Sequence, residues 1–450
     1  MLRALLRILA ICGALTFVAP SGKAETTFAP ALRSPAFPLL SQEPSIYDPA
    51  PTPGPVKALD PIQDKWSDEN ARLSKVRARA FLGLRDYRSA RAETTLVLAA
   101  NADDVDALRT LAAIEEATGR WRHAANNWTR VERLTGDSAA GARREALVRA
   151  HPSYVGLSAF FEGSAGVDQM SGVRLTYAAR PLDGPEWTAV LENRVAQADA
   201  AILRDGSIAA IDENRRKLDV EIADAFAAGR LGLRLIVTDD TFGGGVSFRR
   251  TRPWGALELV AAYKEPYWAY ASNLKNDATY NHIDANVNVW RGRFAWRARV
   301  SLADYNVADQ DSAARSTRAA AGFDYALGDP AGNPVRLNVV IDTENFFAIE
   351  ERQRADRTRY TPIQTVDRAV LSLGAAKTFG DPQRRFATLA LGYRRDAKNE
   401  TQGPYAGVAA ETPLGQRLRI GLRAEYSDVS TRGVTGEPYS FAELYLRRTF

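Results

Sequence analysis

The most constraining feature of this sequence is a two-residue alternation of apolar and polar side chains that recurs through the C-terminal part of the chain. In the segment 294–302 the aromatic and aliphatic residues fall on one face of an extended chain, whereas Arg297 and Arg299 fall on the other. The segments 335–341 and 418–426 show the same division. Strands that contact lipid on one face and a polar interior on the other follow this period. The alternation therefore predicts strands with apolar residues outward and arginines inward.

Sixteen segments fit this description, and an even number allows both ends of an antiparallel barrel to lie on the same side of a membrane. Outside the N-terminus, no apolar run approaches the roughly 18 residues that a spanning helix needs. The predicted strands are 154–163, 172–179, 186–194, 217–227, 229–237, 242–251, 255–264, 280–290, 293–304, 316–326, 335–346, 368–379, 385–394, 404–411, 417–427 and 440–450.

The connections between these segments alternate in length, as they do in outer-membrane barrels with short periplasmic turns and long external loops. Connections after even strands are short and rich in proline and glycine. Those after odd strands are mostly long, namely 195–216, 265–279, 347–367 and 428–439. The connection 238–241 is the exception, because it is short where a long loop is expected. We therefore predict an all-β transmembrane antiparallel barrel of about 16 strands over residues 153–450; a soluble β-sandwich or propeller is the competing fold.

The N-terminus has the pattern of a secretory signal over residues 1–24, with Arg3 and Arg7 before an apolar stretch and small residues at 22–24. The single cysteine, Cys12, falls inside it, so the processed chain would contain no disulfide. Residues 25–61 contain nine of the 22 prolines, which predicts an extended linker.

Residues 62–150 change to helical periodicity and match themselves at an offset of 34 residues. The paired positions are Ala78 with Ala112, Ala80 with Ile114, Tyr87 with Trp121, Ala90 with Ala124, and Val97 with Val131. This period resembles the tetratricopeptide repeat. The match departs from that family where Arg85 pairs with Gly119 and Thr94 with Trp128. A short α-helical tetratricopeptide-like domain is therefore expected before the barrel; an unrelated helical hairpin is the alternative.

The sequence offers no constellation typical of an enzyme. Its three histidines, His123, His151 and His282, lie in different segments without metal-ligand spacing, and no nucleophile or phosphate-loop motif is present. The net charge of +5 is spread over alternating signs rather than clustered, which argues against nucleic-acid binding. We predict neither a catalytic function nor a cofactor or metal.

The interior of the barrel is the predicted functional surface. The residues expected to line the lumen and a substrate path are Asp219, Glu221, Glu258, Asp284, Asn286, Trp290, Arg297, Arg299, Arg336, Asp342, Arg419, Arg423, Glu425 and Tyr445. Such a polar wall suits a hydrated sugar chain, but mutually paired charges would also simply fill a pore. Tyr267, Trp268 and Tyr270 would stack sugars at the mouth, form an interfacial girdle or pack inside a loop.

A signal peptide, helical repeats and a C-terminal barrel together resemble the outer-membrane porins that export bacterial exopolysaccharides such as poly-N-acetylglucosamine, cellulose or Pel. The resemblance implies a barrel in outer-membrane lipid, a periplasmic helical domain that binds polymer or synthase components, and a polysaccharide substrate. The last strand, which ends at Phe450, resembles the signal recognised by barrel-assembly machinery. This chain has fewer repeats than that family, and its many arginines favour a neutral or anionic polymer.

Two other functions fit the same architecture. Outer-membrane modifiers that translocate surface lipoproteins also place tetratricopeptide helices before a barrel, although usually one of fourteen strands. A surface receptor or structural barrel would instead act through its external loops. The number of strands and the state of the lumen distinguish these alternatives.

Overall fold

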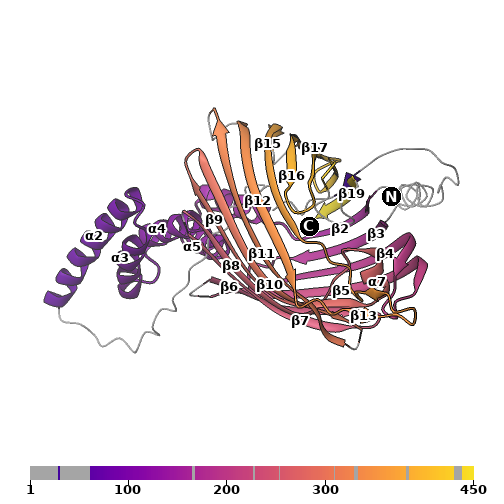
Figure 1. The fold of residues 1–450 in the computed structure, drawn as a ribbon. Coiled ribbons are helices and arrows are strands. Elements are labelled where there is room, and N and C mark those ends of the chain that lie inside the picture. The colour runs from indigo at the N-terminus through magenta and orange to yellow at the C-terminus, as the bar shows by residue number, and fades with distance from the viewer. Residues whose placement is uncertain are drawn as a thin grey trace.

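A computed structural model describes residues 29–30, 61–164, 168–226, 229–252, 254–308, 310–328, 333–381, 385–429 and 438–450 (Figure 1). The predicted signal peptide and nearly all of the predicted proline-rich linker lie outside these residues. The described chain consists of helices followed by a β-barrel, in the predicted order.

The barrel is a closed antiparallel sheet of 16 strands, so the predicted fold class is confirmed. Each strand pairs with its neighbours in sequence, and the last strand closes the barrel against the first through Thr449 and Tyr154 and through Phe450 N–H, which donates to Ser153 O at 3.0 Å. The two-residue β1, Ala29–Pro30, adds a short parallel pairing to the last strand. The barrel strands are β2 Tyr154–Ser164, β3 Asp168–Ala179, β4 Glu186–Ile202, β5 Ile208–Phe226, β6 Gly229–Thr238, β7 Phe242–Arg252, β8 Gly255–Pro266, β9 Ala278–Arg291, β10 Phe294–Val307, β11 Gln310–Leu327, β12 Val335–Phe347, β15 Arg368–Asp381, β16 Arg385–Asp396, β17 Thr401–Pro413, β18 Leu418–Ser427 and β19 Tyr439–Thr449.

The two ends of the barrel differ in their connections. We call the end with short connections and the chain's helices the turn end, and the opposite one the loop end. At the loop end the prediction of a long connection over 195–216 is wrong, because β4 and β5 extend as a paired ribbon to the turn 203–207. The short connection 238–241 is nevertheless a real loop-end turn, closed by Thr238 N–H donating to Thr241 O at 2.8 Å.

Apolar side chains cover the outer face of the barrel, with Leu233, Ile283 and Val300 all more than half exposed. Exposed aromatic residues collect near both ends of the strands. Those near the turn end are Tyr177, Trp187, Trp254, Phe294, Phe379 and Phe450, and those near the loop end are Phe161, Phe242, Tyr263, Phe347 and Tyr393. An apolar band between two aromatic girdles is the surface that a membrane barrel presents to lipid. None of the helices in the described part of the chain is long and apolar enough to cross a membrane.

In the described part of the chain, five helices precede the barrel: α2 Pro61–Gly83, α3 Tyr87–Ala100, α4 Val105–Ala117, α5 Trp121–Thr135 and α6 Ser138–Ala150. The offset of 34 residues corresponds to a repeated backbone geometry. Arg85 and Gly119, which each lie two residues after the first helix of a pair, both adopt a left-handed conformation, with φ of 60° and 66°. Thr94 and Trp128 are both buried at equivalent positions. The two sequence departures therefore occupy equivalent sites, although the tetratricopeptide assignment itself stays a prediction.

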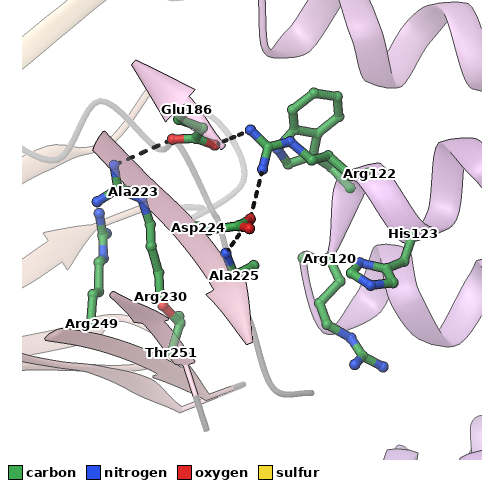
Figure 2. Close-up of a pocket in the computed structure, with 12 residues that line it drawn as sticks. Arg120, Arg122, His123, Glu186, Ala223, Asp224, Ala225, Arg230, Arg249 and Thr251 are labelled. Carbon is green, nitrogen blue, oxygen red and sulfur yellow. Dashed lines mark hydrogen bonds and ion pairs between the residues drawn. The ribbon is translucent and has the colours of Figure 1, made fainter. Parts of the chain in front are cut away.

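The helices are joined to the turn end of the barrel at the start of α5 (Figure 2). Arg122 forms an ion pair with Glu186 of β4 at 3.0 Å, and both side chains are nearly buried. Arg230 of β6 reaches the same carboxylate at 3.3 Å. Burial and the charges of Arg91 and Arg122 lower the pKa of the neighbouring His123. The shared carboxylate fixes α5 to the barrel rim.

Candidate functional site: a lumen closed at its loop end

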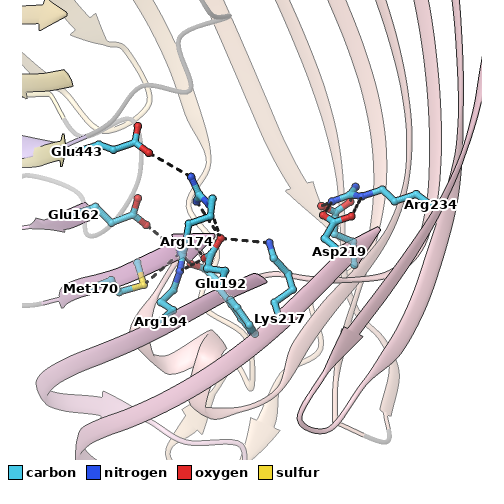
Figure 3. Close-up of polar contacts among 11 residues, drawn as sticks. Glu162, Met170, Arg174, Glu192, Arg194, Lys217, Asp219, Arg234 and Glu443 are labelled. Carbon is cyan, nitrogen blue, oxygen red and sulfur yellow. Dashed lines mark hydrogen bonds and ion pairs between the residues drawn. The ribbon is translucent and has the colours of Figure 1, made fainter. Parts of the chain in front are cut away.

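A network of ion pairs lines the barrel interior (Figure 3). Glu192 of β4 accepts hydrogen bonds from Arg174 at 3.0 Å and pairs with Arg194 at 2.8 Å. Lys217 of β5 approaches the same carboxylate at 3.8 Å. These side chains point inward because they alternate along their strands with lipid-facing residues such as Leu191.

The network continues around the wall from β5 to β10. Arg234 joins Asp219 at 2.5 Å to Glu265 at 2.9 Å. His282 then bridges Glu265 at 3.0 Å and Asp284 at 3.5 Å. Each acid and base therefore has a partner on an adjacent strand, which offsets the cost of placing charge inside the barrel.

Most of the charged residues predicted to line the lumen do lie on the inner face and belong to such pairs. The pairs, with their N–O distances, are Glu221 with Arg230 (3.4 Å), Asp284 with Arg299 (2.7 Å), Arg297 with Asp324 (3.4 Å), Asp342 with Arg318 (2.5 Å), Arg419 with Glu411 (2.7 Å), Arg423 with Glu443 (3.8 Å) and Glu425 with Arg394 (3.1 Å). Their role in a substrate path stays a prediction.

The remaining predicted lumen residues also lie on the inner face by the same alternation, but they form fewer polar contacts than the residues above. Tyr445 donates a hydrogen bond to Glu411 at 2.9 Å. Asn286 and Trp290 lie on the inner face of β9, with Trp290 39% exposed, and Arg336 lies near Asp324. Among the described residues Glu258 has no ion-pair partner.

The two members of these pairs differ in their exposure to the lumen. The side chains of Arg423, Arg299 and Arg447 are 55%, 38% and 36% exposed. Their partners Glu443, Asp284 and Glu411 are only 10%, 9% and 5% exposed. In these three pairs the carboxylate lies against the wall and the guanidinium group in front of it, whereas the order is reversed where Arg394, 2% exposed, pairs with Glu425, 13% exposed.

Glu265 and Arg234 belong to the network but were not among the predicted residues. For Glu265 the reason is a local change in the strand. Glu265 follows a β-bulge in which Lys264 has a positive φ of 50°, and the pairing with β9 shifts between Ala262 and Glu265. The bulge reverses the alternation, so a strict period of two assigns Glu265 to the outer face. Arg234 is different, because it alternates regularly with Leu233 and Leu235 and was open to prediction.

At the loop end the connection between β8 and β9, which carries the short helix α7, Ala271–Lys275, packs against the inner wall. Leu274 is fully buried in a cluster with Met170 and Ile211, both on the inner wall. Arg194 donates to the backbone oxygen of Trp268 at 3.2 Å. Because these partners face inward, the connection lies inside the barrel and not above it.

Three loop-end connections interlock over α7. The amide of Asn273, which is fully buried, donates to Gln364 O at 3.1 Å, and Gln364 N–H donates to Asn273 Oδ1 at 2.9 Å. Asn276 accepts from Arg204 N–H at 3.0 Å. Tyr360, in the small hairpin of β13 (Arg352–Gln353) and β14 (Arg359–Tyr360), donates to Arg204 O at 3.2 Å. Loops far apart in the sequence therefore close this end of the barrel together.

The three predicted mouth aromatics lie inside this closure. Trp268 is 9% exposed and Tyr270 is 1% exposed. The ring of Tyr267 packs edge to face against the ring of Tyr305, with 4.6 Å between the ring centres. Burial raises the pKa of the Tyr267 hydroxyl well above its usual value. Of the three roles considered for them, loop packing describes this arrangement, and sugar stacking stays a prediction for an open state.

Among the described residues, no group of three or more histidine, cysteine, aspartate or glutamate side chains is arranged to hold a metal ion. The ion pairs and hydrogen bonds described above offer recognition by hydrogen bonding and charge.

No protein-family model matches the sequence, and no curated protein matches it. Among solved structures, the chain is similar to one described as a bacterial polysaccharide outer membrane secretin, with a TM-score of 0.43 and 13% identity over 66% of this chain and 98% of that chain. It is also similar to the Salmonella typhi OmpF complex with daunomycin, with a TM-score of 0.35 and 9% identity over 66% of this chain and 96% of that chain. An anion-selective porin from Comamonas acidovorans gives a TM-score of 0.33 and 11% identity over 66% and 98% of the two chains. These similarities assign no function to the chain.

Proposed function

We propose that this chain is an outer-membrane channel through which an exopolysaccharide with carboxylate or hydroxyl groups leaves the cell. The observation that carries the proposal is the set of lumen arginines that stand in front of buried carboxylates, represented by Arg423 and Arg299. Guanidinium groups donate several hydrogen bonds in a plane, which matches both carboxylates and sugar hydroxyls. Since each arginine already has a partner, it can contact a passing chain without holding it tightly.

The location follows from the outer surface of the barrel. An apolar band between two girdles, represented by Trp187 at the turn end and Tyr263 at the loop end, supports insertion in a membrane. In such barrels short turns face the periplasm and long loops face the exterior. The helices at the turn end would then lie in the periplasm, where they can contact polymer or synthase components before export.

Export through this lumen requires the loop end to open. α7 and the connections that carry Arg204 and Gln364 close it by hydrogen bonds and by burial of Leu274. All of these contacts are between loops or between a loop and the inner wall, so they can break without unpairing a strand. The closed lumen is therefore compatible with a channel that opens only during export.

Two alternatives remain as separate proposals. Lipoprotein translocation is less favoured because the barrel has 16 strands rather than the fourteen expected of those modifiers. A receptor acting through its external loops is favoured by the interlocked loop end, in which Asn273 and Gln364 hold distant connections together. The receptor would keep its function with a blocked lumen, whereas the channel would not.

The test is extracellular polymer in a strain that lacks this gene and is complemented with intact or altered chains. Gly407 lies on the inner face of β17, and a side chain added there meets its nearest atom only at 3.8 Å. Gly407→Trp should therefore fold and obstruct the lumen, as should the bulky substitution Arg423→Trp. Ala406→Trp, which puts the same ring on the adjacent lipid-facing position, is the matched control.

We expect loss of secreted polymer and periplasmic accumulation with Gly407→Trp, and normal secretion with Ala406→Trp. The obstruction is checked by conductance in a chain whose residues 268–276 are replaced by a Gly-Ser linker, where Gly407→Trp should lower the conductance and Ala406→Trp should not. Secretion that persists with a substitution shown in this way to block the lumen would refute the channel. Polymer unchanged in the strain without the gene would favour the receptor.

A further inference from the structure

Two arginines near the end of β7, Arg250 and Arg252, lie on the outer face of the barrel. Their neighbours Arg249 and Thr251 line the pocket at the joint with the helices, together with the inward-facing Arg230 (Figure 2). Side chains alternate along a strand, so the residues between and beyond these two point outward. β7 therefore presents two positive charges on the face that the barrel turns towards lipid.

The two arginines lie at the level of the aromatic girdle of the turn end. β7 ends at Arg252, and Trp254, two residues later, is 56% exposed. The residues of β8 that pair with Arg250 and Arg252 are the uncharged Leu257 and Gly255. At this depth the apolar band of a membrane meets the lipid headgroups, which a long arginine side chain reaches at little cost. The position makes a lipid headgroup the neighbour of both side chains.

The positive charge at this place is not balanced within the described part of the chain, where neither arginine forms an ion pair with a carboxylate. The charged side chains that act on Arg252 are Arg250 and Arg88, at the start of α3. Asp86, two residues before Arg88, caps α3 by accepting a hydrogen bond from Ser89 N–H at 3.2 Å. That carboxylate offsets at most one of the three positive charges, so a net positive charge remains for a ligand to neutralise.

The geometry of the two arginines suits a phosphate group. Arg250 is half-buried and its Nε is covered by protein atoms, so the stem of the side chain lies along the barrel surface. Residues two positions apart on one strand are separated by about 7 Å, which allows both guanidinium groups to reach one phosphate. A guanidinium group donates paired hydrogen bonds to phosphate oxygens. A headgroup that also carries an ammonium would add a further positive charge here, whereas an anionic headgroup would not.

We propose that Arg250 and Arg252, with Arg88 beside them, bind the phosphate of an anionic phospholipid in the leaflet at the turn end. Basic clusters at a membrane surface attract lipids of net negative charge in this way. The lipid would contact both the outer wall of the barrel and α3, so it would hold the helices at the membrane surface. The inference goes beyond the proposed export function, because it concerns the lipid-facing surface and not the lumen.

Native mass spectrometry of the full chain tests the site, with the protein released from detergent that contains equal amounts of phosphatidylglycerol and phosphatidylcholine. We expect the chain to retain phosphatidylglycerol severalfold more than phosphatidylcholine. Arg250→Gln with Arg252→Gln should reduce the retention of phosphatidylglycerol to that of phosphatidylcholine. Arg448→Gln is the matched control and should keep the preference, because Arg448 is also an exposed arginine on the outer face at the turn end, paired with Leu418.

Equal retention of the two lipids by the unaltered chain, or an unchanged preference in the double glutamine variant, would overturn the site. Arg250→Lys with Arg252→Lys keeps both charges and should keep a preference for phosphatidylglycerol. An equal loss in the lysine and glutamine variants would contradict recognition by charge.

Two further arms test the source of the phosphate and the part of α3. Inorganic phosphate in large excess should not displace phosphatidylglycerol, and displacement would identify a site for a soluble anion and overturn the lipid site. Arg88→Gln should weaken the preference less than the double glutamine variant does, and no change would remove α3 from the site. None of these measurements depends on secretion, so they stand apart from the test of the export function.

Discussion

Two regions of the barrel interior, the part of the loop end around α7 and the remaining inner wall, are built on different principles. Around α7 the inner wall carries small and apolar side chains, and Met170 and Ile211 pack against α7 as in the core of a soluble protein. Elsewhere the inner wall is a lattice of ion pairs such as Arg174 with Glu192, and this lattice reaches the loop end at Arg394 with Glu425. The apolar cluster excludes water, whereas the charged side chains of the ion-pair lattice require hydration.

The difference separates closure from passage. A packed apolar cluster gains stability from each buried methylene group, so it favours a single closed arrangement. An ion-pair lattice facing water gains little from any one pair, but it keeps the wall polar without a large net charge. A packed region beside a charged, hydrated wall is the combination that the proposed export channel requires, since the first would close the lumen and the second would contact a hydrated chain.

The largest expected effect comes from removing the packed region. Replacing residues 268–276 by a short Gly-Ser linker deletes Trp268 and Leu274 from the inner cluster and removes the hydrogen bonds of Asn273. We expect single-channel conductance in planar bilayers to rise severalfold. Conductance equal to that of the unaltered chain would show that another constriction limits the lumen, and the contrast between the two regions would lose its functional meaning.

The second effect tests the lattice at its most buried pair. Arg394 is 2% exposed, bonds Glu425 at 3.1 Å and lies 4.2 Å from the ring centre of Tyr405. Arg394→Met leaves Glu425 without this partner and should lower the free energy of unfolding by about 3–5 kcal/mol. Urea unfolding in lipid vesicles measures it. The double change Arg394→Met with Glu425→Leu should recover most of the loss, and a double variant as unstable as the single one would contradict this account.

A third effect tests packing at the loop end. Leu274→Ala leaves a cavity beside Met170 and should destabilise the closed loop by about 2–5 kcal/mol. Trypsin cleavage after Lys275 should then accelerate, because cleavage requires the loop to open. Leu371→Ala on the lipid-facing side of β15 is the control and should leave the cleavage rate unchanged. Acceleration by both substitutions would point to general loosening of the barrel.

Much of the barrel was predictable because lipid and lumen impose opposite demands on successive residues. Strand β10 shows this directly, since Trp296 and Val300 are exposed on the outside while Arg297 and Arg299 form ion pairs inside. The pairing of those arginines was not predictable, because a partner such as Asp324 follows from register and not from the sequence of β10.

The closed loop end could not be predicted from sequence. Ala271 and Leu274 lie in a segment whose composition resembles any connecting loop, and their burial depends on wall residues from β3 to β5. The bonds between Asn273 and Gln364 join positions 91 residues apart. Long-range contacts of this kind leave no periodic trace, so only the three-dimensional arrangement reveals them.

The smallest effect is expected where an ion pair belongs to neither region. The guanidinium group of Arg359 lies 2.8 Å from a carboxylate oxygen of Glu351 at the loop end, but the two side chains are 77% and 55% exposed. Water and salt screen such a pair, so Arg359→Ala should change the free energy of unfolding by no more than about 1 kcal/mol. The same urea titration used for Arg394→Met provides the comparison, because the two substitutions each remove one arginine from a pair of similar length. A loss as large as that of Arg394→Met would mean that burial does not set the strength of these pairs, and that the surface hairpin contributes to closure as much as the packed interior does.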